Sequence, residues 1–523
     1  MARLPGYFLL ALVLLISGRG MAQKVYSDPA LEKPLRLEIP AGSDNETYRI
    51  IPCAADGMIL FFKSTEITAD NKVKWYFTRY DKNLQSVWTK PVPLGAGMEY
   101  AGSNPGQDTL SLFFQTGESD KGESPAFQVL RVLVNKGSFI LNYGALPENA
   151  SMACFTVVRQ KCFTGLNIKN QQAQLMILDL PTGKQDFVPV TGSPQTSFAA
   201  LQADPADMTL TAVVRKQLTK RFWDNYFVRM NPDGTLLGET LIVTQAPERQ
   251  LAESRIFSLP GGEKLVAGSY VLTSSLSDQH QKGTAKTTGL FIAGFSGLTQ
   301  TSAKFTNFLD LKCADSFLSE RDIMAIRKKA VKKSKIITEY SADLNLIMHD
   351  IIPKDDHFIL LGEAYYLQYH TESFTDFDFY GRPYTNSYSV FDGFRFTSAI
   401  VASFDFSGNL LWDNSMEIRN LLSENLDPKV SIMFSGDDAV LTYLSDGKIG
   451  YKIIREGTTI EKTDYTDIDL SLPEDRLVNE TKSRMVRWYD NYYLCYGYQE
   501  IKNLSYTGNA TKLVFFCNKV RFD

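Results

Sequence analysis

A run of aromatic and charged side chains between residues 364 and 398 has the composition best suited to recognising a ligand. Tyrosine and phenylalanine recur through it, with aspartates and arginine interleaved. Tyrosine offers a flat apolar face and a hydroxyl and loses few rotamers on binding, so sugars or peptide side chains can stack on it. The candidate ligand-binding residues are Tyr366, Tyr380, Arg382, Tyr384, Tyr388 and Asp392.

A second interpretation of this segment stays open. The rings could instead pack on one another as a small satellite core that anchors a long loop inserted between two strands. The phenylalanines would serve that core more than the tyrosines. In either case we expect an aromatic-rich loop at about 364–398.

The sequence carries no motif for the common catalytic chemistries, such as a nucleophile elbow, a zinc-protease helix, a phosphate loop or a dinucleotide fingerprint. The four histidines are scattered. Asp376 to Gly381 begins like a calcium loop, but Tyr380 occupies the third ligand position and the downstream glutamate is missing. We therefore assign no catalytic residue, no metal ligand and no cofactor.

The N-terminus has the pattern of a secretory signal. Arg3 precedes an apolar run from Tyr7 to Ile16, and small residues lead to Ala22. The run is shorter than the ~20 residues that span a bilayer. We expect a signal peptide over 1–22, no transmembrane segment in the mature chain, and export to the periplasm, the outer surface or the medium. The net charge of −4 gives no general attraction to nucleic acid.

The strands that must position the candidate ligand-binding residues are predicted by a sequence pattern that repeats along the chain. A strand, a tight turn rich in Asp, Asn and Gly, and a second strand recur along the chain, as at Asp81 to Asn83, Asn135 to Gly137 and Ser407 to Asn409. A second hairpin precedes most of these. Two hairpins make a four-stranded antiparallel sheet, and we count eight such units in the 523 residues. The pattern predicts an all-β fold, a single β-propeller domain over 23–523 with eight blades, or alternatively seven.

The two ends of the chain are expected to share the last blade. Three strands at about 484–488, 492–498 and 513–517 lack a fourth, and Leu35 to Ile39 alternates apolar and polar residues as an edge strand does. This arrangement places Cys495 and Cys517 on adjacent antiparallel strands. They are therefore the candidate disulfide among the six cysteines.

The stretch from Asp405 to Trp412 has the spacing D-x-x-G-x-x-x-W, which resembles the blade turns of quinoprotein-type propellers. Asp81 to Trp88 is similar, with Leu84 at the glycine position. In that family the tryptophan docks neighbouring blades. The resemblance supports the fold and not a quinone enzyme. More broadly, the chain resembles exported bacterial β-propellers of uncharacterised type.

One further insertion is expected at about 309–337. Ser319 and Asp322 have capping-box spacing, and lysines crowd the second half of Asp315 to Lys335, which predicts an amphipathic helix. Two interpretations of this helix stay open: a solvated helix that covers a blade edge, and a dock for an acidic partner or a lipid surface.

The expected function is a non-catalytic binding or scaffold propeller of the cell envelope, whose partner is a glycan, a peptide or another envelope protein. A hydrolase or lyase acting on glycans or peptides at the axial face stays open. The carboxylate pairs of such enzymes are set by separation in space, which sequence does not show.

Overall fold

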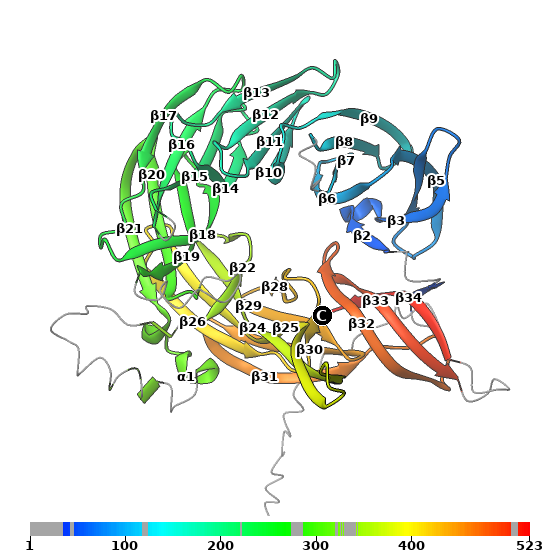
Figure 1. Ribbon diagram of the computed structural model, residues 1–523. Coiled ribbons are helices and arrows are strands. Elements are labelled where there is room, and N and C mark those ends of the chain that lie inside the picture. Colours follow the sequence, from blue (N-terminus) through cyan, green and yellow to red (C-terminus); the bar gives the residue numbers. More distant parts are fainter. Residues whose placement is uncertain are drawn as a thin grey trace, which may run out of the picture.

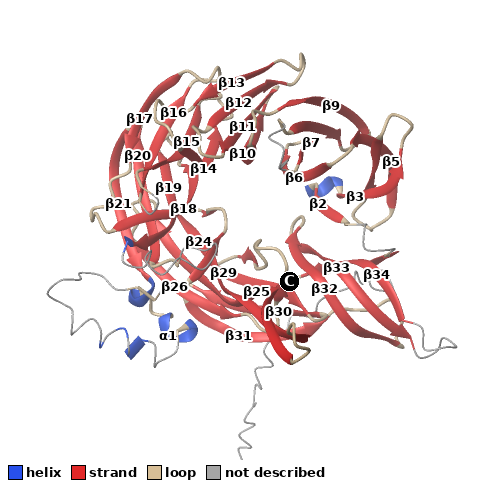
Figure 2. Ribbon diagram, viewed as in Figure 1, coloured by secondary structure: helices blue, strands red, loops and turns tan. Residues whose placement is uncertain are grey.

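The computed structural model describes residues 35–41, 47–117, 124–219, 222–273, 286–318, 323–324, 326, 328, 341–342, 344–503 and 511–522. Its strands form eight antiparallel sheets that follow one another around a ring (Figure 1). Strands and short turns account for nearly all of that ring (Figure 2). The predicted all-β, propeller-like fold is confirmed, and the count of eight blades fits better than seven. We number the sheets as blades 1 to 8 in chain order.

Each of blades 1 to 4 is a simple up-and-down sheet, because consecutive strands pair with one another. Blade 1 consists of β2 (Arg49–Pro52), β3 (Met58–Ile67), β4 (Lys72–Tyr80) and β5 (Ser86–Gly95), and blade 2 of β6 (Met98–Pro105), β7 (Thr109–Thr116), β8 (Ala126–Leu133) and β9 (Ser138–Ala145). Blade 3 consists of β10 (Ala150–Val158), β11 (Lys161–Ile168), β12 (Gln174–Asp179) and β13 (Gln185–Pro189), and blade 4 of β14 (Thr196–Ala203), β15 (Leu210–Gln217), β16 (Trp223–Met230) and β17 (Leu236–Leu241).

Blades 5 and 7 repeat that order, blade 6 carries two additional short strands, and blade 8 joins both ends of the chain. Blade 5 consists of β18 (Arg249–Ser258), β19 (Lys264–Leu272), β20 (Gly289–Ser296) and β21 (Thr299–Asn307). Blade 6 consists of β22 (Asn345–Met348), β23 (Ile352–Lys354), β24 (His357–Phe377), β25 (Pro383–Asp405), β26 (Leu410–Glu417) and β27 (Leu422–Ser423). Blade 7 consists of β28 (Ser431–Ser435), β29 (Asp438–Ser445), β30 (Lys448–Arg455) and β31 (Thr458–Asp467), and blade 8 of β32 (Asp475–Arg487), β33 (Tyr492–Asn503), β34 (Thr511–Arg521) and β1 (Arg36–Pro40).

Apolar side chains fill the space between every two neighbouring blades. Eight buried clusters are present in the described residues, and each draws its members from two adjacent blades. Phe61 of blade 1 and Leu112 of blade 2 share one cluster, for example, and Ile50 of blade 1 shares another with Leu494 of blade 8. Because each sheet is covered on both faces, its central strands are continuous runs of buried residues.

The tryptophans that follow the turns at Asp81 and Asp405 each contact the next blade. In the first, Leu84 adopts a φ of 56°, the conformation that glycine would take more easily. The Trp88 indole then reaches blade 2 and donates a hydrogen bond to the Val134 carbonyl at 3.1 Å. In the second, Trp412 packs so closely on the blade 7 turn that a Cβ added at Gly457 would lie 2.7 Å from the Trp412 Cβ.

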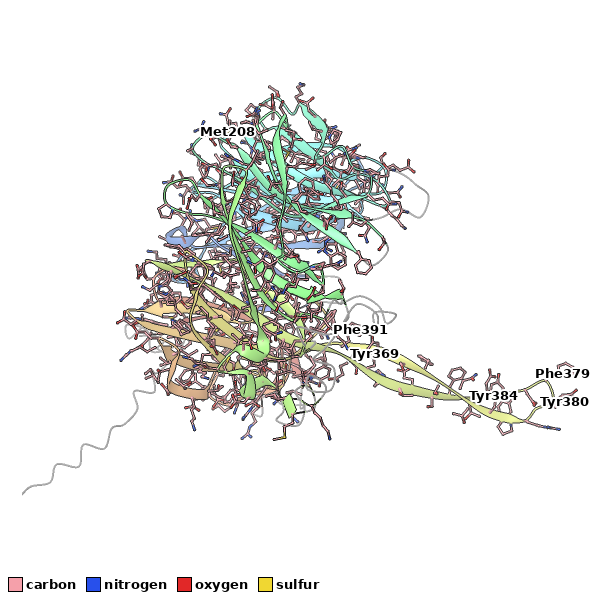
Figure 3. All side chains as sticks on the ribbon, turned by 90° about the vertical axis from the view of Figure 1, so that its left-hand side faces the viewer. Met208, Tyr369, Phe379, Tyr380, Tyr384 and Phe391 are labelled. Carbon is pink, nitrogen blue, oxygen red and sulfur yellow. The ribbon has the colours of Figure 1, made fainter. Side chains whose placement is uncertain are left out.

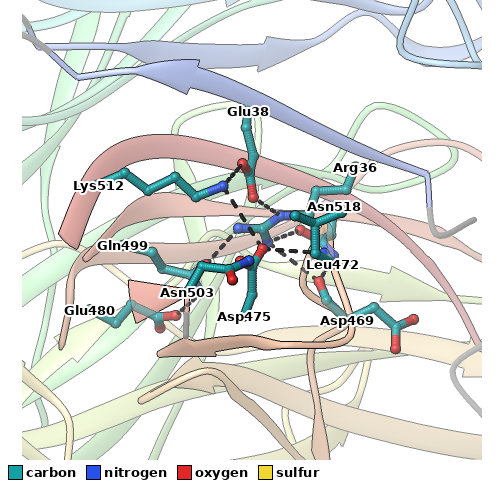
Figure 4. A network of polar contacts seen from close by, with 10 residues as sticks. All are labelled: Arg36, Glu38, Asp469, Leu472, Asp475, Glu480, Gln499, Asn503, Lys512 and Asn518. Atoms are coloured by element: carbon teal, nitrogen blue, oxygen red, sulfur yellow. Dashed lines mark hydrogen bonds and ion pairs between the residues drawn. The ribbon is translucent and has the colours of Figure 1, made fainter. Parts of the chain in front are cut away.

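The predicted pairing of the two ends is confirmed. β1 runs antiparallel to β34, and a polar network holds it in place (Figure 4). The buried Arg36 guanidinium donates to Glu38 at 2.8 Å, to Asn518 at 2.7 Å and to Gln499 at 2.7 Å. Lys512 donates to the other Glu38 oxygen at 2.8 Å. The fourth strand of blade 8 therefore comes from the other end of the chain, which leaves β34 no open edge.

Two predicted segments lie largely or wholly outside the described residues. The signal peptide over 1–22 is one. Of the inserted helix at about 309–337, the structure describes the short α1 (Ala314–Phe317), which follows a 3₁₀ turn at Phe308–Asp310, and little beyond it. In the described part of the chain, no helix has the length and apolar character to cross a membrane.

Candidate ligand-binding arm and cleft

The segment at 364–398 is a long β-hairpin and not the loop expected from the sequence. β24 and β25 pair from His357 and Asp405 out to Phe377 and Pro383, far past the rest of blade 6. We call residues 366–394 the arm, which projects away from the blades and out of the plane of the ring (Figure 3). Its aromatic and Thr residues favour extended backbone, and this local preference continues the strands beyond the sheet.

The tip of the arm is a tight turn held by Asp378. This carboxylate accepts hydrogen bonds from the backbone N–H of Tyr380 at 2.8 Å and of Arg382 at 2.9 Å. Gly381 supplies the positive φ of 73° that the turn requires. The turn presents Phe379, which is 97% exposed, and Tyr380, over whose ring the Arg382 guanidinium lies 5.7 Å from the centroid.

The ladder separates the arm residues into two faces, because directly paired residues share a face and successive residues alternate. One side, the hydroxyl face, carries no charge. The other, the acidic face, carries carboxylates and tyrosines. The hydroxyl face consists of Tyr369, Thr371, Ser373, Thr375, Phe377, Pro383, Thr385, Ser387, Ser389 and Phe391. The acidic face consists of Tyr366, Gln368, His370, Glu372, Phe374, Asp376, Tyr384, Asn386, Tyr388 and Val390.

Cross-strand hydrogen bonds order the acidic face. The Tyr388 hydroxyl donates to the Glu372 carboxylate, and the Tyr384 hydroxyl donates to Asp376 at 3.2 Å. The His370 ring lies between Asp392 and Glu372 and hydrogen-bonds to both. These contacts raise the pKa of His370, with Asp392 the larger cause, and the His370 ring lowers the pKa of Asp392 in return.

The structure brings four of the six predicted ligand-binding residues to this one face. Tyr366, Tyr384 and Tyr388 lie on it, and Asp392 occupies a bulge from which it reaches the His370 ring. Tyr380 and Arg382 lie at the tip. The three tyrosines of the acidic face are each 44–50% exposed, so they are not the satellite core of the alternative interpretation. Only at the arm's base, where Tyr365 and Phe396 are buried, do the rings pack as a core.

A cleft of about 330 Å³ opens at the base of the arm. Its wall combines the arm, the connection from blade 6 to blade 7, the end of β29 in blade 7, the inner strands of blades 1 and 2, and three strands of blade 8. Charged and tyrosine side chains in this wall include Tyr48, Arg49, Tyr100, Asp392, Lys429, Glu480, Lys482, Arg484, Tyr496 and Tyr498.

Glu480 is a partly buried carboxylate in the wall of the cleft. Burial raises its pKa, although Ser483 Oγ and Gln499 Nε2 each donate a hydrogen bond to it at 2.6 Å. The cations of the cleft have partners of their own, since Arg484 and Lys429 both pair with Asp427. The cleft therefore presents mixed polar groups and aromatic faces, with one carboxyl biased toward its neutral form.

Glu363 is a buried residue near the cleft that the sequence analysis missed. Its side chain is fully buried and accepts hydrogen bonds from the backbone N–H of Lys429 and of Val430, both at 2.8 Å, while His349 Nε2 lies 2.6 Å away. This contact fixes the connection that carries Lys429 into the cleft wall. Glu363 and His349 are 14 residues apart in the sequence, and no motif marks them as neighbours.

The predicted disulfide between Cys495 and Cys517 is wrong. The strands are adjacent as expected, but Cys495 lies opposite Asn518 and Cys517 lies opposite Tyr496. The offset of one residue turns the two thiols to opposite faces of blade 8, where Cys495 joins the cluster with blade 7 and Cys517 the cluster with blade 1. Both cysteines are free.

No protein-family model and no curated protein matches the chain. Among solved structures, it is similar to one from a study of two prolyl endopeptidases, at 9% identity and a TM-score of 0.38 over 89% of this chain and 54% of the other, which is about half its length. It is also similar to the polysaccharide lyase Uly1 (9%, TM-score 0.36, covering 93% and 100%) and to a eukaryotic initiation factor (10%, TM-score 0.39, covering 91% of both). At this level, these similarities carry no argument about function.

Proposed function

We propose that this protein is an exported, non-catalytic binding propeller of the cell envelope, which holds a glycan or peptide segment on the acidic face of the arm and in the cleft at its base. The observation that carries the proposal is the row of exposed tyrosines and carboxylates on one face of the arm, leading to the cleft through Asp392. Exposed rings offer stacking surfaces, and the carboxylates accept hydrogen bonds from hydroxyl or amide groups.

We favour binding because the hairpin exposes large aromatic side chains to solvent, although its structure does not require them. Phe374 and Tyr388 lie side by side on the acidic face with ring centroids 6.1 Å apart, yet each is about half exposed. A solvent-exposed cluster of aromatic residues on a protruding element is typical of an interaction site. The ordered hydrogen bonds of Tyr384 and Tyr388 reduce the rotamer freedom that binding would otherwise remove.

The test is a binding screen of the mature protein against glycans and peptides, repeated with Tyr384→Ala and Tyr388→Ala. The matched control is Tyr143→Ala, because Tyr143 is 75% exposed on the outer strand of blade 2, away from the arm. We expect at least a tenfold loss of affinity for each arm variant and none for the control. Equal affinity of all three variants for the ligand found would contradict the proposal.

A hydrolase or lyase acting on glycans or peptides is the second candidate, and Glu480 is the observation in its favour. A carboxyl whose pKa is raised by burial is suited to act as a general acid, and Glu480 lies in the wall of a cleft large enough for a sugar ring. Under this alternative, a screened ligand is converted to product and Glu480→Gln abolishes the conversion. Under the binding proposal, the ligand is recovered intact after prolonged incubation with the unmodified protein.

A further inference from the structure

The outer edge of β24 is open along the arm. Between residues 366 and 377, the described strands give β24 a single partner, β25, while β22 pairs with it only at the base, up to Tyr365. An unpaired strand edge offers a row of free N–H and C=O groups, which proteins usually block with lysine, proline or a bulge. β25 has such features in Pro383 and the bulge at Asp392, whereas β24 has neither lysine nor proline from 369 to 377.

We propose that the β24 edges of two copies of this chain pair antiparallel about a two-fold axis at Ser373, so that two arms form one four-stranded sheet. In this register Tyr369 of each copy lies opposite Phe377 of the other. His370 lies opposite Asp376, and Thr371 lies opposite Thr375. Glu372 lies opposite Phe374. Aromatic and Thr–Thr pairs are favourable cross-strand combinations, and His370 in its protonated form is opposite in charge to Asp376.

Charge also selects this register over its neighbours. A shift of two residues in one direction places Glu372 opposite Glu372 of the second copy, and a shift in the other direction places it opposite Asp376. Both bring like charges together, which destabilises a directly opposed pair. A shift of one residue would join the charged face of one arm to the uncharged face of the other and is not compatible with the two-fold axis.

The length and direction of the arm fit the same arrangement. The arm projects out of the plane of the ring (Figure 3). Two rings can therefore face each other with their arms side by side. The register centred on Ser373 places Tyr380 at the tip of one arm level with Tyr366 at the base of the other, so the arms overlap over their full length. The interface is closed, as in most symmetric dimers. It also removes the marginal stability of an isolated two-stranded ribbon.

This pairing goes beyond the proposed function, because it uses the strand edge and leaves the acidic face free. The test is cysteine cross-linking of the purified chain with Ser373→Cys, whose thiol would lie on the two-fold axis. Directly opposed side chains in an antiparallel pair have Cβ atoms about 4.5–5.5 Å apart, close enough for mild oxidation to link them. The matched control is Ser387→Cys. Ser387 lies opposite Ser373 on β25 and on the same face, and both serines are exposed to solvent.

We expect Ser373→Cys to run as a covalent dimer without reductant, and Ser387→Cys and the parent to run as monomers. Light scattering should show a dimer for the parent, and Ser373→Lys should weaken its association at least tenfold while Ser387→Lys does not. Cross-linking of Ser387→Cys as fast as that of Ser373→Cys would overturn the pairing. So would a parent that stays monomeric at concentrations of about 100 μM, a range in which specific interfaces associate.

Discussion

Leu37 lies directly opposite Cys517, in the antiparallel register that makes the first described strand the fourth strand of the last blade. Leu37 and Cys517 also both contact the apolar cluster that lies between blades 8 and 1. One short strand thus completes a sheet and helps to seal the ring. The stability of the whole ring should depend on the side chains that hold this strand.

Arg36→Ala should be strongly destabilising. The guanidinium is buried and donates hydrogen bonds to Glu38, Gln499 and Asn518. Its removal takes this donor from all three side chains, and of the cations in the described residues only Lys512 still contacts Glu38. Loss of one partner from a buried ion pair costs about 3–5 kcal/mol in the free energy of unfolding. Chemical denaturation followed by fluorescence would measure this loss in the free energy of unfolding. Lys184→Ala is the control, since it breaks the exposed pair with Asp186 and should cost less than about 0.5 kcal/mol.

The thiols of Cys495 and Cys517 should stay unlinked even after oxidation of the folded protein. They lie on opposite faces of their sheet, and burial raises the pKa of both, which disfavours the reactive thiolate. Peptide mapping without reductant should recover the two peptides separately, and reductant should not change the denaturation midpoint. A linked peptide would mean that the register of β33 and β34 is wrong.

Removal of rings from the arm should leave the fold intact. Tyr388→Ala acts on a half-exposed side chain, and surface substitutions usually change stability by less than about 0.5 kcal/mol. Tyr365→Ala, one residue before the arm, removes a buried ring and should cost about 3 kcal/mol. Thermal melts of the two variants would compare them. Equal losses would mean that the arm rings belong to the core.

The contribution of His370 to the order of the arm should depend on pH. Its pKa in the folded chain is raised above the unfolded value of about 6.5 by the hydrogen bonds to Asp392 and Glu372. The stabilisation is therefore complete below pH ~6.5 and is lost as the pH rises through the folded pKa. An NMR titration of the histidine ring should show the raised pKa, and Asp392→Asn should return it toward 6.5. A His370 pKa unchanged by that substitution would contradict the pairing.

The blade hairpins were predictable because their turns leave a local signature. Asp81 and Asp405 each accept hydrogen bonds from the backbone amides that follow, so the turn is encoded within five residues. The arm was not predictable as a hairpin, since its composition alone did not show where strand pairing would end. The cysteine pairing failed for a related reason. Adjacent strands were foreseen, but the parity of the register, which decides the face of each thiol, depends on contacts across the whole blade.

The contact of Arg36 with Asn518 joins residues 482 positions apart, and this separation bears on how the ring is made. A ribosome adds roughly 5–20 residues per second, so β1 would wait about 25–100 s for its partner strand. During that time the earlier blades can form by local strand pairing, but the ring is not yet closed by the pairing of β1 with β34. β34 therefore decides when β1 can complete its sheet, because β34 is the strand with which β1 pairs.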